Sequence, residues 1–233
     1  MTVFIRLVLA YLLADFVIFR ERIFNLKQKN KIAGYLLHAA IYAALILLLC
    51  LPYMDMTWLN IKSLALNGWQ TLPLLALAHI LIGIADKSES KTCGVCRTVA
   101  FLLWQIVAVS ILFLVFPLLG VQQTLEVNYC WENFLIISAG ALFATYFIST
   151  LVYFIEKDLS GEDKPVFDVK YTSMLMRLAL YLLLLAPGLT GWLLGGLWII
   201  FYFVAGGIDV SPARKFVGLP LAVAIAVLVK FVI

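Results

Sequence analysis

Hydrophobic residues along this chain form eight long runs, separated by short polar stretches. The runs contain Leu, Ala and Phe without strict alternation, and each is near the ~20 residues that a helix needs to cross a membrane. Alternating barrel strands are a poorer description of these runs. The predicted membrane segments are Val3–Phe19, Ala33–Leu51, Trp69–Ala85, Thr98–Leu119, Asn133–Ile155, Ser173–Ala186, Leu189–Gly207 and Val217–Ile233. We therefore expect an all-α, polytopic membrane helix bundle of about eight transmembrane helices, forming one integral membrane domain over residues 1–233.

The polar connections are mostly short. Pro187 and Gly188 predict a tight turn that makes the sixth and seventh helices an antiparallel hairpin. The outer loop 52–71 carries two tryptophans, Trp58 and Trp69, and we expect an interfacial helix there. The loop 156–172 is acidic without the spacing of a calcium loop and is interpreted as a solvated linker. The third segment, Trp69–Ala85, could be a helix that enters the membrane without crossing it. The distribution of charged residues decides this question.

Basic residues fall on one side if all eight segments cross. Of the 17 Lys and Arg residues, 14 then lie in or beside alternate loops. By the positive-inside rule these are the cytoplasmic loops, 20–32, 86–97, 156–172 and 208–216. If the third segment failed to cross, this asymmetry would disappear. We therefore predict a bacterial inner-membrane protein with both termini on the outer side.

Composition restricts the function classes further. The chain is 64% hydrophobic and 13% charged, far from the balance of a soluble domain. A net charge of +4 and four cysteines exclude direct nucleic-acid binding through a basic face and a secreted disulfide scaffold. No nucleotide-binding loop, hydrolase elbow or zinc-protease motif occurs.

Few polar groups interrupt the apolar runs. Asp15, His38, His79 and Gln105 each lie about 6 to 10 Å from the cytoplasmic end of their segment, at 1.5 Å per residue. Four different helices thus place a polar group in one layer near the cytoplasmic side of the membrane. These groups form either a structural hydrogen-bond network or a functional site that holds a metal, relays protons or forms a polar vestibule. The charges interpreted as lying at the cytoplasmic boundary are Asp86, Lys87 and Arg177.

The cysteines form two pairs. Cys93 and Cys96 have the C-x-x-C spacing of a metal or redox pair, but zinc needs two further ligands, so an inert reduced pair is preferred. Cys50 and Cys130 both fall on the outer side and are a candidate disulfide. The candidate metal ligands are therefore Asp15, His38, His79, Cys93 and Cys96. We predict no cofactor except bound lipid. Zinc and manganese are the metals whose binding should be tested.

Short motifs resemble an uncharacterised bacterial membrane-protein family, domain of unknown function 3307. They are Leu9–Phe16, Tyr35–Tyr42 and Ala78–Ile82, followed in the second half by Met174–Arg177 and Lys215–Pro220. The resemblance is that of a divergent member, because this chain has Tyr11 and Ala108 at positions where the family has His. The resemblance implies membrane location and helical architecture, and it implies no reaction.

The function preferred from sequence is a non-enzymatic integral membrane module: a channel, a solute-binding subunit, or a sensor or effector acting with a cytoplasmic partner. The first alternative is a membrane-embedded metal-dependent hydrolase of a lipid or isoprenoid substrate, with Asp15, His38 and His79 as ligands or acid and base. The second is a defence or stress effector that permeabilises the membrane. Expected partners are membrane lipids, a second copy of the chain, or a cytoplasmic protein contacting the basic loop Arg20–Lys31.

Overall fold

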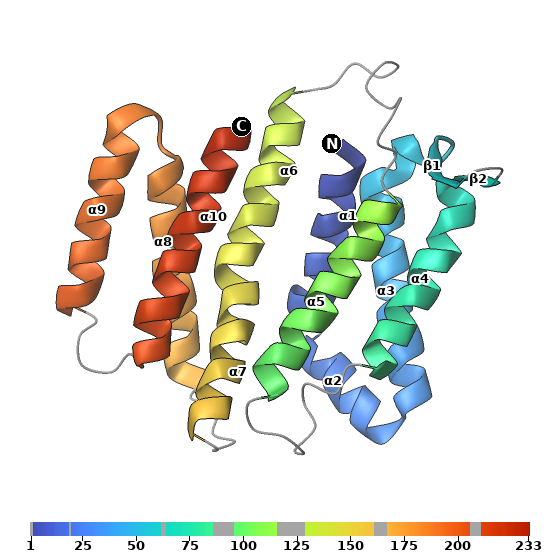
Figure 1. Cartoon of the computed structure of the whole chain (residues 1–233), viewed down its shortest axis with the longest axis horizontal. Helices are drawn as coiled ribbons and strands as arrows, with labels where there is room; N and C mark the ends of the chain where they lie inside the picture. Colours follow the sequence, from blue (N-terminus) through green and yellow to red (C-terminus); the bar gives the residue numbers. More distant parts are fainter. Residues whose placement is uncertain are drawn as a thin grey trace. The chain divides into compact units, whose positions relative to one another are not determined.

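The structure, a computed structural model, is a set of long helices with one small hairpin of strands (Figure 1). It describes residues 2–18, 20–61, 64–85, 96–115, 129–160, 167–205 and 211–233. The helices are α1 Thr2–Leu12, α2 Arg20–Lys29, α3 Lys31–Cys50, α4 Gly68–Ala85, α5 Cys96–Leu114, α6 Tyr129–Leu142, α7 Ile148–Ser160, α8 Phe167–Leu185, α9 Gly188–Ala205 and α10 Leu219–Val232. Three π-helical turns extend or join them, η1 Leu13–Val17, η4 Phe143–Phe147 and η5 Arg214–Gly218, and a short 3-10 turn, η2 Leu51–Tyr53, follows α3.

Each predicted membrane segment coincides with a long helical stretch, so the all-α prediction is confirmed. Within the part of the chain that the structure describes, five stretches are long and apolar enough to cross a membrane by length and composition. They are Lys31–Tyr53, Gly68–Ala85, Arg97–Leu114, Cys130–Leu159 and Arg214–Val232. Two shorter apolar helices, Tyr171–Leu185 and Gly188–Val204, accompany them. The full count of eight crossings remains a prediction.

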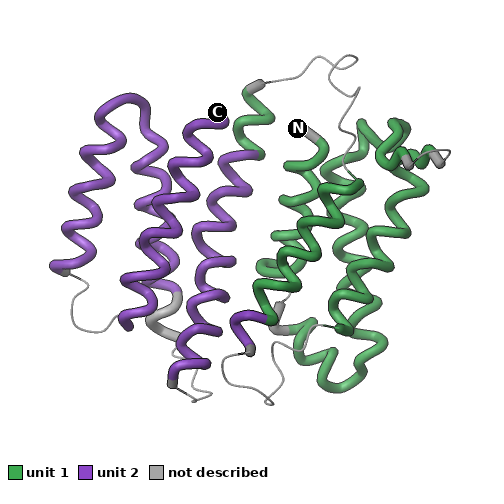
Figure 2. The backbone as a smooth tube through the Cα atoms, in the orientation of Figure 1, with its two compact units in different colours: residues 1–89, 100–135 green, residues 90–99, 136–233 purple. Residues whose placement is uncertain are grey.

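The chain divides into two compact units, and one integral membrane domain over residues 1–233 stays a prediction (Figure 2). The first unit contains residues 1–89 and 100–135, and the second contains residues 90–99 and 136–233. The division falls inside two helices, α5 and α6, whose apolar patterns run on without a break, so the sequence carried no linker signal for it.

In the first unit, α3 packs against α1, α2 and α4. Asn30 caps the start of α3, because its side-chain oxygen accepts a hydrogen bond from the Ala33 amide at 3.1 Å. That cap separates α3 from the short polar helix α2 and reverses the chain, so that α2 lies along the beginning of α3.

The predicted interfacial helix in the loop 52–71 is wrong. An antiparallel hairpin forms instead, with β1 at Thr57–Ile61 and β2 at Leu64–Asn67. The first strand is rich in aromatic and β-branched residues, which favour strands. Trp58 anchors it, because its side chain is buried and its indole N–H donates to the Tyr53 carbonyl at 2.8 Å.

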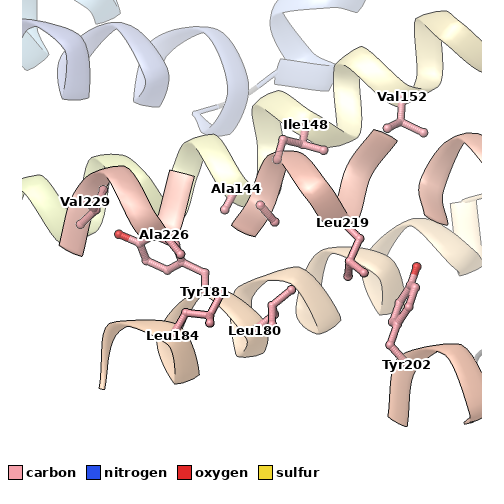
Figure 3. Packing of buried hydrophobic residues seen from close by; sticks show 11 residues of the cluster. Ala144, Ile148, Val152, Leu180, Tyr181, Leu184, Tyr202, Leu219, Ala226 and Val229 are labelled. Atoms are coloured by element: carbon pink, nitrogen blue, oxygen red, sulfur yellow. The ribbon is translucent and has the colours of Figure 1, made fainter. Parts of the chain in front are cut away.

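The second unit has a compact apolar core between α7, α8, α10 and the π-helical turn η4 (Figure 3). Tyr181 is fully buried there, and its hydroxyl donates to the Ile137 carbonyl at 2.8 Å. The predicted α8–α9 hairpin is confirmed: Gly188 adopts φ +63°, a left-handed conformation that a glycine accepts without strain. Gly195 permits close packing in this hairpin, since a Cβ there would approach the Leu184 side chain to 2.3 Å.

Candidate functional site

Asp15, His38 and His79 meet in the interior of the first unit. They come from three elements: η1 carries Asp15, α3 carries His38 and α4 carries His79. Asp15 Oδ1 lies 3.2 Å from His38 Nε2 and 3.3 Å from His79 Nε2. The two imidazole rings are 4.6 Å apart between centroids. One candidate ligand atom from each residue lies within 4.8 Å of the others, so three side chains distant in sequence form one polar cluster, which we call the Asp–His cluster.

The backbone at this cluster is irregular. Asp15 occupies the π-helical turn η1, whose wider winding ends the helix that begins with α1. Single π turns of this kind are frequent at functional sites. Here the turn lies opposite α3, and it packs against that helix.

Two buried atoms of the cluster lack a hydrogen bond. Among the described residues, Asp15 Oδ1 and His79 Nε2 have no hydrogen-bond partner, although they face each other at 3.3 Å. His79 is 8% exposed. A buried polar atom without a partner costs about 1 to 3 kcal/mol, so this arrangement favours a bound group between the two atoms. A carboxylate oxygen and an imidazole nitrogen are both ligands for a divalent metal ion.

Lys27 contacts the cluster from outside. Its ammonium lies 3.1 Å from His38 Nδ1. An ammonium group only donates hydrogen bonds, so His38 Nδ1 accepts and its proton is assigned to Nε2. That Nε2–H donates to the Ala14 carbonyl at 3.2 Å and faces Asp15. In this arrangement His38 offers no free lone pair toward the cluster.

Gly34 makes the Lys27 contact possible. A Cβ at Gly34 would lie 2.7 Å from the Lys27 backbone nitrogen and 2.8 Å from its Cα. Backbone atoms cannot move aside cheaply, so only glycine lets α2 approach α3 this closely. The Lys27 ammonium also lies 4.9 Å from the Tyr35 ring centroid. Sequence reasoning assigned Lys27 to a solvated basic loop and missed this role, for which the tertiary approach of α2 is required.

Aromatic side chains enclose His79. Tyr42 stacks on its ring at 4.5 Å between centroids, and Tyr11 packs edge-on at 6.1 Å. The Tyr11 hydroxyl donates to Gln105 Oε1 at 2.6 Å, so Gln105 reaches the cluster only through Tyr11. The hollow beside His79 measures about 10 Å³, which is room for about one water molecule.

The other predicted site residues lie elsewhere. Arg177 is buried at 3% exposure in the middle of α8, and its place at the cytoplasmic boundary stays a prediction. Asp86, Lys87 and Cys93 fall outside the described residues, as does the side chain of Cys96 at the start of α5.

The predicted disulfide between Cys50 and Cys130 is not formed. Both are free thiols, and Cys50 is buried at the end of α3 whereas Cys130 is exposed in the first turn of α6. A disulfide needs the two Cβ atoms about 4 Å apart, and a shared outer side of the membrane does not by itself meet that condition.

Comparison with known proteins identifies the family. The family described as "Protein of unknown function (DUF3307)" matches residues 3–136, more than half of the chain, so this protein belongs to that family. The matched range includes Asp15, His38, His79 and Gln105. No curated protein and no solved structure matches the chain.

Proposed function

We propose that this member of the DUF3307 family is a non-enzymatic integral membrane sensor that binds a divalent metal ion at the Asp–His cluster and reports it through α2. The observation that carries the proposal is the convergence of Asp15, His38 and His79, with Asp15 Oδ1 and His79 Nε2 lacking hydrogen-bond partners among the described residues.

The spacing of the cluster suits zinc or manganese. With metal–ligand bonds of 2.0 to 2.1 Å, the edge of a tetrahedral zinc site is about 3.3 Å. The contacts of Asp15 Oδ1 with the two histidine nitrogens are 3.2 and 3.3 Å. Two imidazoles and one carboxylate would provide three ligands and leave a fourth position for a water molecule or another group.

Metal binding and Lys27 docking exclude each other. Coordination of His38 through Nε2 moves the ring proton to Nδ1, and that N–H then opposes the Lys27 ammonium, which can only donate. A divalent ion also repels Lys27 at this short range. We therefore expect a bound ion to release Lys27 from His38, and α2 to leave the beginning of α3.

The helix α2 is the output of this sensor. It lies in the basic loop Arg20–Lys31, predicted to be cytoplasmic, where its last turn contains Lys27 and Lys29. Release of Lys27 would change the basic surface offered to an acidic cytoplasmic partner or to anionic lipid headgroups.

A hydrolase at the same cluster has less support. The three convergent ligands meet its first requirement, but a lipid or isoprenoid substrate also needs space beside the metal. The hollow next to His79 has about 10 Å³ and is lined by aromatic and aliphatic side chains. A sensor needs only the ion, and the cluster is large enough for that.

The membrane setting of the proposal is the inner membrane of a bacterium, with eight crossings and both termini outside. It is supported by the five helices of membrane length and by the 14 basic residues on one predicted side. In a chain whose four native cysteines are replaced by serine, a membrane-impermeant thiol reagent tests the sidedness: from outside intact cells it should label a cysteine introduced at Asp55 but not one introduced at Gln28.

The metal site is tested by measuring the metal content and affinity of the purified protein. We expect about one zinc or manganese ion per chain, and at least about a hundredfold loss of affinity in the His38→Ala/His79→Ala double variant. Lys29→Gln, which removes an exposed charge from α2, is the matched control and should bind like the wild type. Equal metal affinity in the wild type and the double variant would overturn the proposal.

The coupling to α2 is tested with Lys27→Met. This variant keeps all three ligands and removes the competing ammonium, so we expect metal affinity to rise about tenfold, equivalent to about 1.4 kcal/mol. A spin label at Gln28 should become more mobile when metal is added to the wild type, and it should already be mobile in Lys27→Met. If the metal affinity of Lys27→Met equals that of the wild type, Lys27 does not compete with the metal ion, and the proposed coupling to α2 is wrong.

A further inference from the structure

The second unit contains a buried cation without a partner of opposite charge. Arg177 is 3% exposed, and its Nη2 donates to the Ser149 hydroxyl. Its Nε and Nη1 have no hydrogen-bond partner among the described residues. Ser149 is neutral, and it donates its own proton to the Thr145 carbonyl at 2.6 Å. Arg177 therefore keeps its full charge and most of its five N–H donors unmatched.

Three other interior cations of the described chain have a carboxylate or two carbonyl oxygens as partners, which Arg177 lacks, although Arg6 Nε is also without a hydrogen-bond partner. Arg6 binds Glu132 at 2.6 Å and the Leu49 carbonyl at 2.8 Å. Lys230 donates to the carbonyls of Leu184 and Ala186 at 3.0 and 2.8 Å.

Arg214, which lies in the same turn η5 as Gly218, is also matched. It forms a two-point ion pair with Glu156, at 3.0 and 3.1 Å. Ser211 donates to the same carboxylate. Glu156 is thus held directly by Arg214 and Ser211 and attracts the Arg177 charge only at longer range, without an ion pair between them.

A second donor accompanies Arg177. Ser173 lies four residues earlier on α8, hence on the same helix face, and is 4% exposed. Its hydroxyl oxygen is also without a hydrogen-bond partner among the described residues. Gly218 of η5 packs directly against the end of the Arg177 side chain, because a Cβ there would come within 2.8 Å of Arg177 Nη1. One face of α8 thus carries two buried side chains whose donors are unmatched among the described residues.

We propose that Arg177 and Ser173 form a binding site for an anionic phosphate group, independent of the Asp–His cluster. A phosphate has several acceptor oxygens and can therefore bind several N–H donors and a hydroxyl at once. An anion with a single contact point cannot do this as well. The charge also needs compensation, because Arg177 lies about 9 Å inside the apolar helix that begins at Tyr171. The phosphate is either that of an anionic lipid headgroup or free inorganic phosphate.

The test compares thermal unfolding of the full chain with and without each source of phosphate. Delipidated protein in a maltoside detergent receives sodium phosphate against sodium chloride at equal ionic strength, and protein in nanodiscs is compared with and without phosphatidylglycerol. At saturation we expect the Tm of the wild type to rise by about 5 °C with one source, and Arg177→Gln to show no rise. A response only to phosphatidylglycerol identifies a lipid site, and a response to sodium phosphate identifies a free-anion site.

Two further variants keep the test decisive if Arg177→Gln does not fold. Ser173→Ala retains Arg177 and should weaken phosphate binding about fivefold. Lys29→Gln, a loss of one exposed charge, should respond like the wild type. The proposal is overturned if neither source raises the Tm of the wild type, or if Ser173→Ala and Arg177→Gln respond as fully as the wild type does.

Discussion

The two units each bury polar groups without hydrogen-bond partners among the described residues, and the candidate sites formed by some of these groups favour ligands of opposite charge. In the first unit, Asp15 Oδ1 and His79 Nε2 together favour a cation, and Arg6 Nε is a further unmatched atom. In the second unit, Arg177 Nε and Nη1 and the Ser173 hydroxyl favour an anion, and Asp158 Oδ1 is a further unmatched atom. The same physical cost of an unmatched buried group therefore points to two different ligands.

In each unit a glycine packs against a cationic residue, but the cationic residue has a different role. In the first, Gly34 holds the backbone of Lys27 close, and Lys27 can compete with a metal ion. In the second, Gly218 gives space to the end of the Arg177 side chain, which is itself the proposed binding group. A cation is thus a removable competitor in one unit and a fixed part of the site in the other.

The comparison fails most clearly if the two sites respond to the same variants. We expect His38→Ala/His79→Ala to lower metal affinity at least about a hundredfold and to leave the phosphate-induced rise in Tm unchanged. Arg177→Gln should give the reverse pattern. Metal titration and thermal unfolding of both variants check this, and loss of both responses in either variant would mean that one site does not exist independently of the other.

A smaller effect is expected on the free energy of unfolding, which should respond differently at a cation with an ionic partner and at one without. Glu132→Gln removes the partner of Arg6 and should destabilise the protein by about 3 kcal/mol, because it leaves a buried charge unpaired. Arg177→Met, measured without phosphate, should change stability by less than about 1 kcal/mol, since it removes a charge that has no ionic partner. Unfolding in mixed micelles measures both. A larger loss in Arg177→Met than in Glu132→Gln would contradict the distinction.

The smallest expected difference concerns the two glycines. Gly34→Ala forces a Cβ against backbone atoms of α2 and should cost about 1 to 3 kcal/mol. Gly218→Ala meets the Arg177 Nη1 atom, the end of a flexible side chain, and should cost less. Gly196→Ala is the control, because no atom lies within 4 Å of a Cβ there. Thermal unfolding of the three variants should rank them in this order, and equal losses would show that neither close approach matters.

Much of the candidate site could be anticipated from single residues. Asp15, His38 and His79 are conspicuous because ionisable groups inside apolar runs are costly and need partners. Arg177 was interpreted as a boundary charge, because a sequence pattern gives the depth of a residue but not which neighbours its side chain meets. Lys27 was not recognised, since nothing in a basic loop indicates that one of its lysines faces a buried histidine.

Local errors had a similar origin. The loop 52–71 was expected to be helical because its aromatic residues suit a membrane interface, yet the pairing of Thr57–Ile61 with Leu64–Asn67 makes it a hairpin. The Cys50–Cys130 disulfide was inferred from a shared side of the membrane, whereas a disulfide depends on distance and direction.

The sequence by itself determined the all-α class, the positions of the long helices and the α8–α9 turn, because hydrophobic runs, Pro187 and Gly188 act through local backbone physics. Only the tertiary structure decided which polar groups meet. The contact of Lys27 with His38, and the lack of hydrogen-bond partners at Arg177 Nε and Nη1 among the described residues, depend on how helices approach one another. That approach is set by side-chain volumes on several elements at once, as the glycines at positions 34 and 218 illustrate.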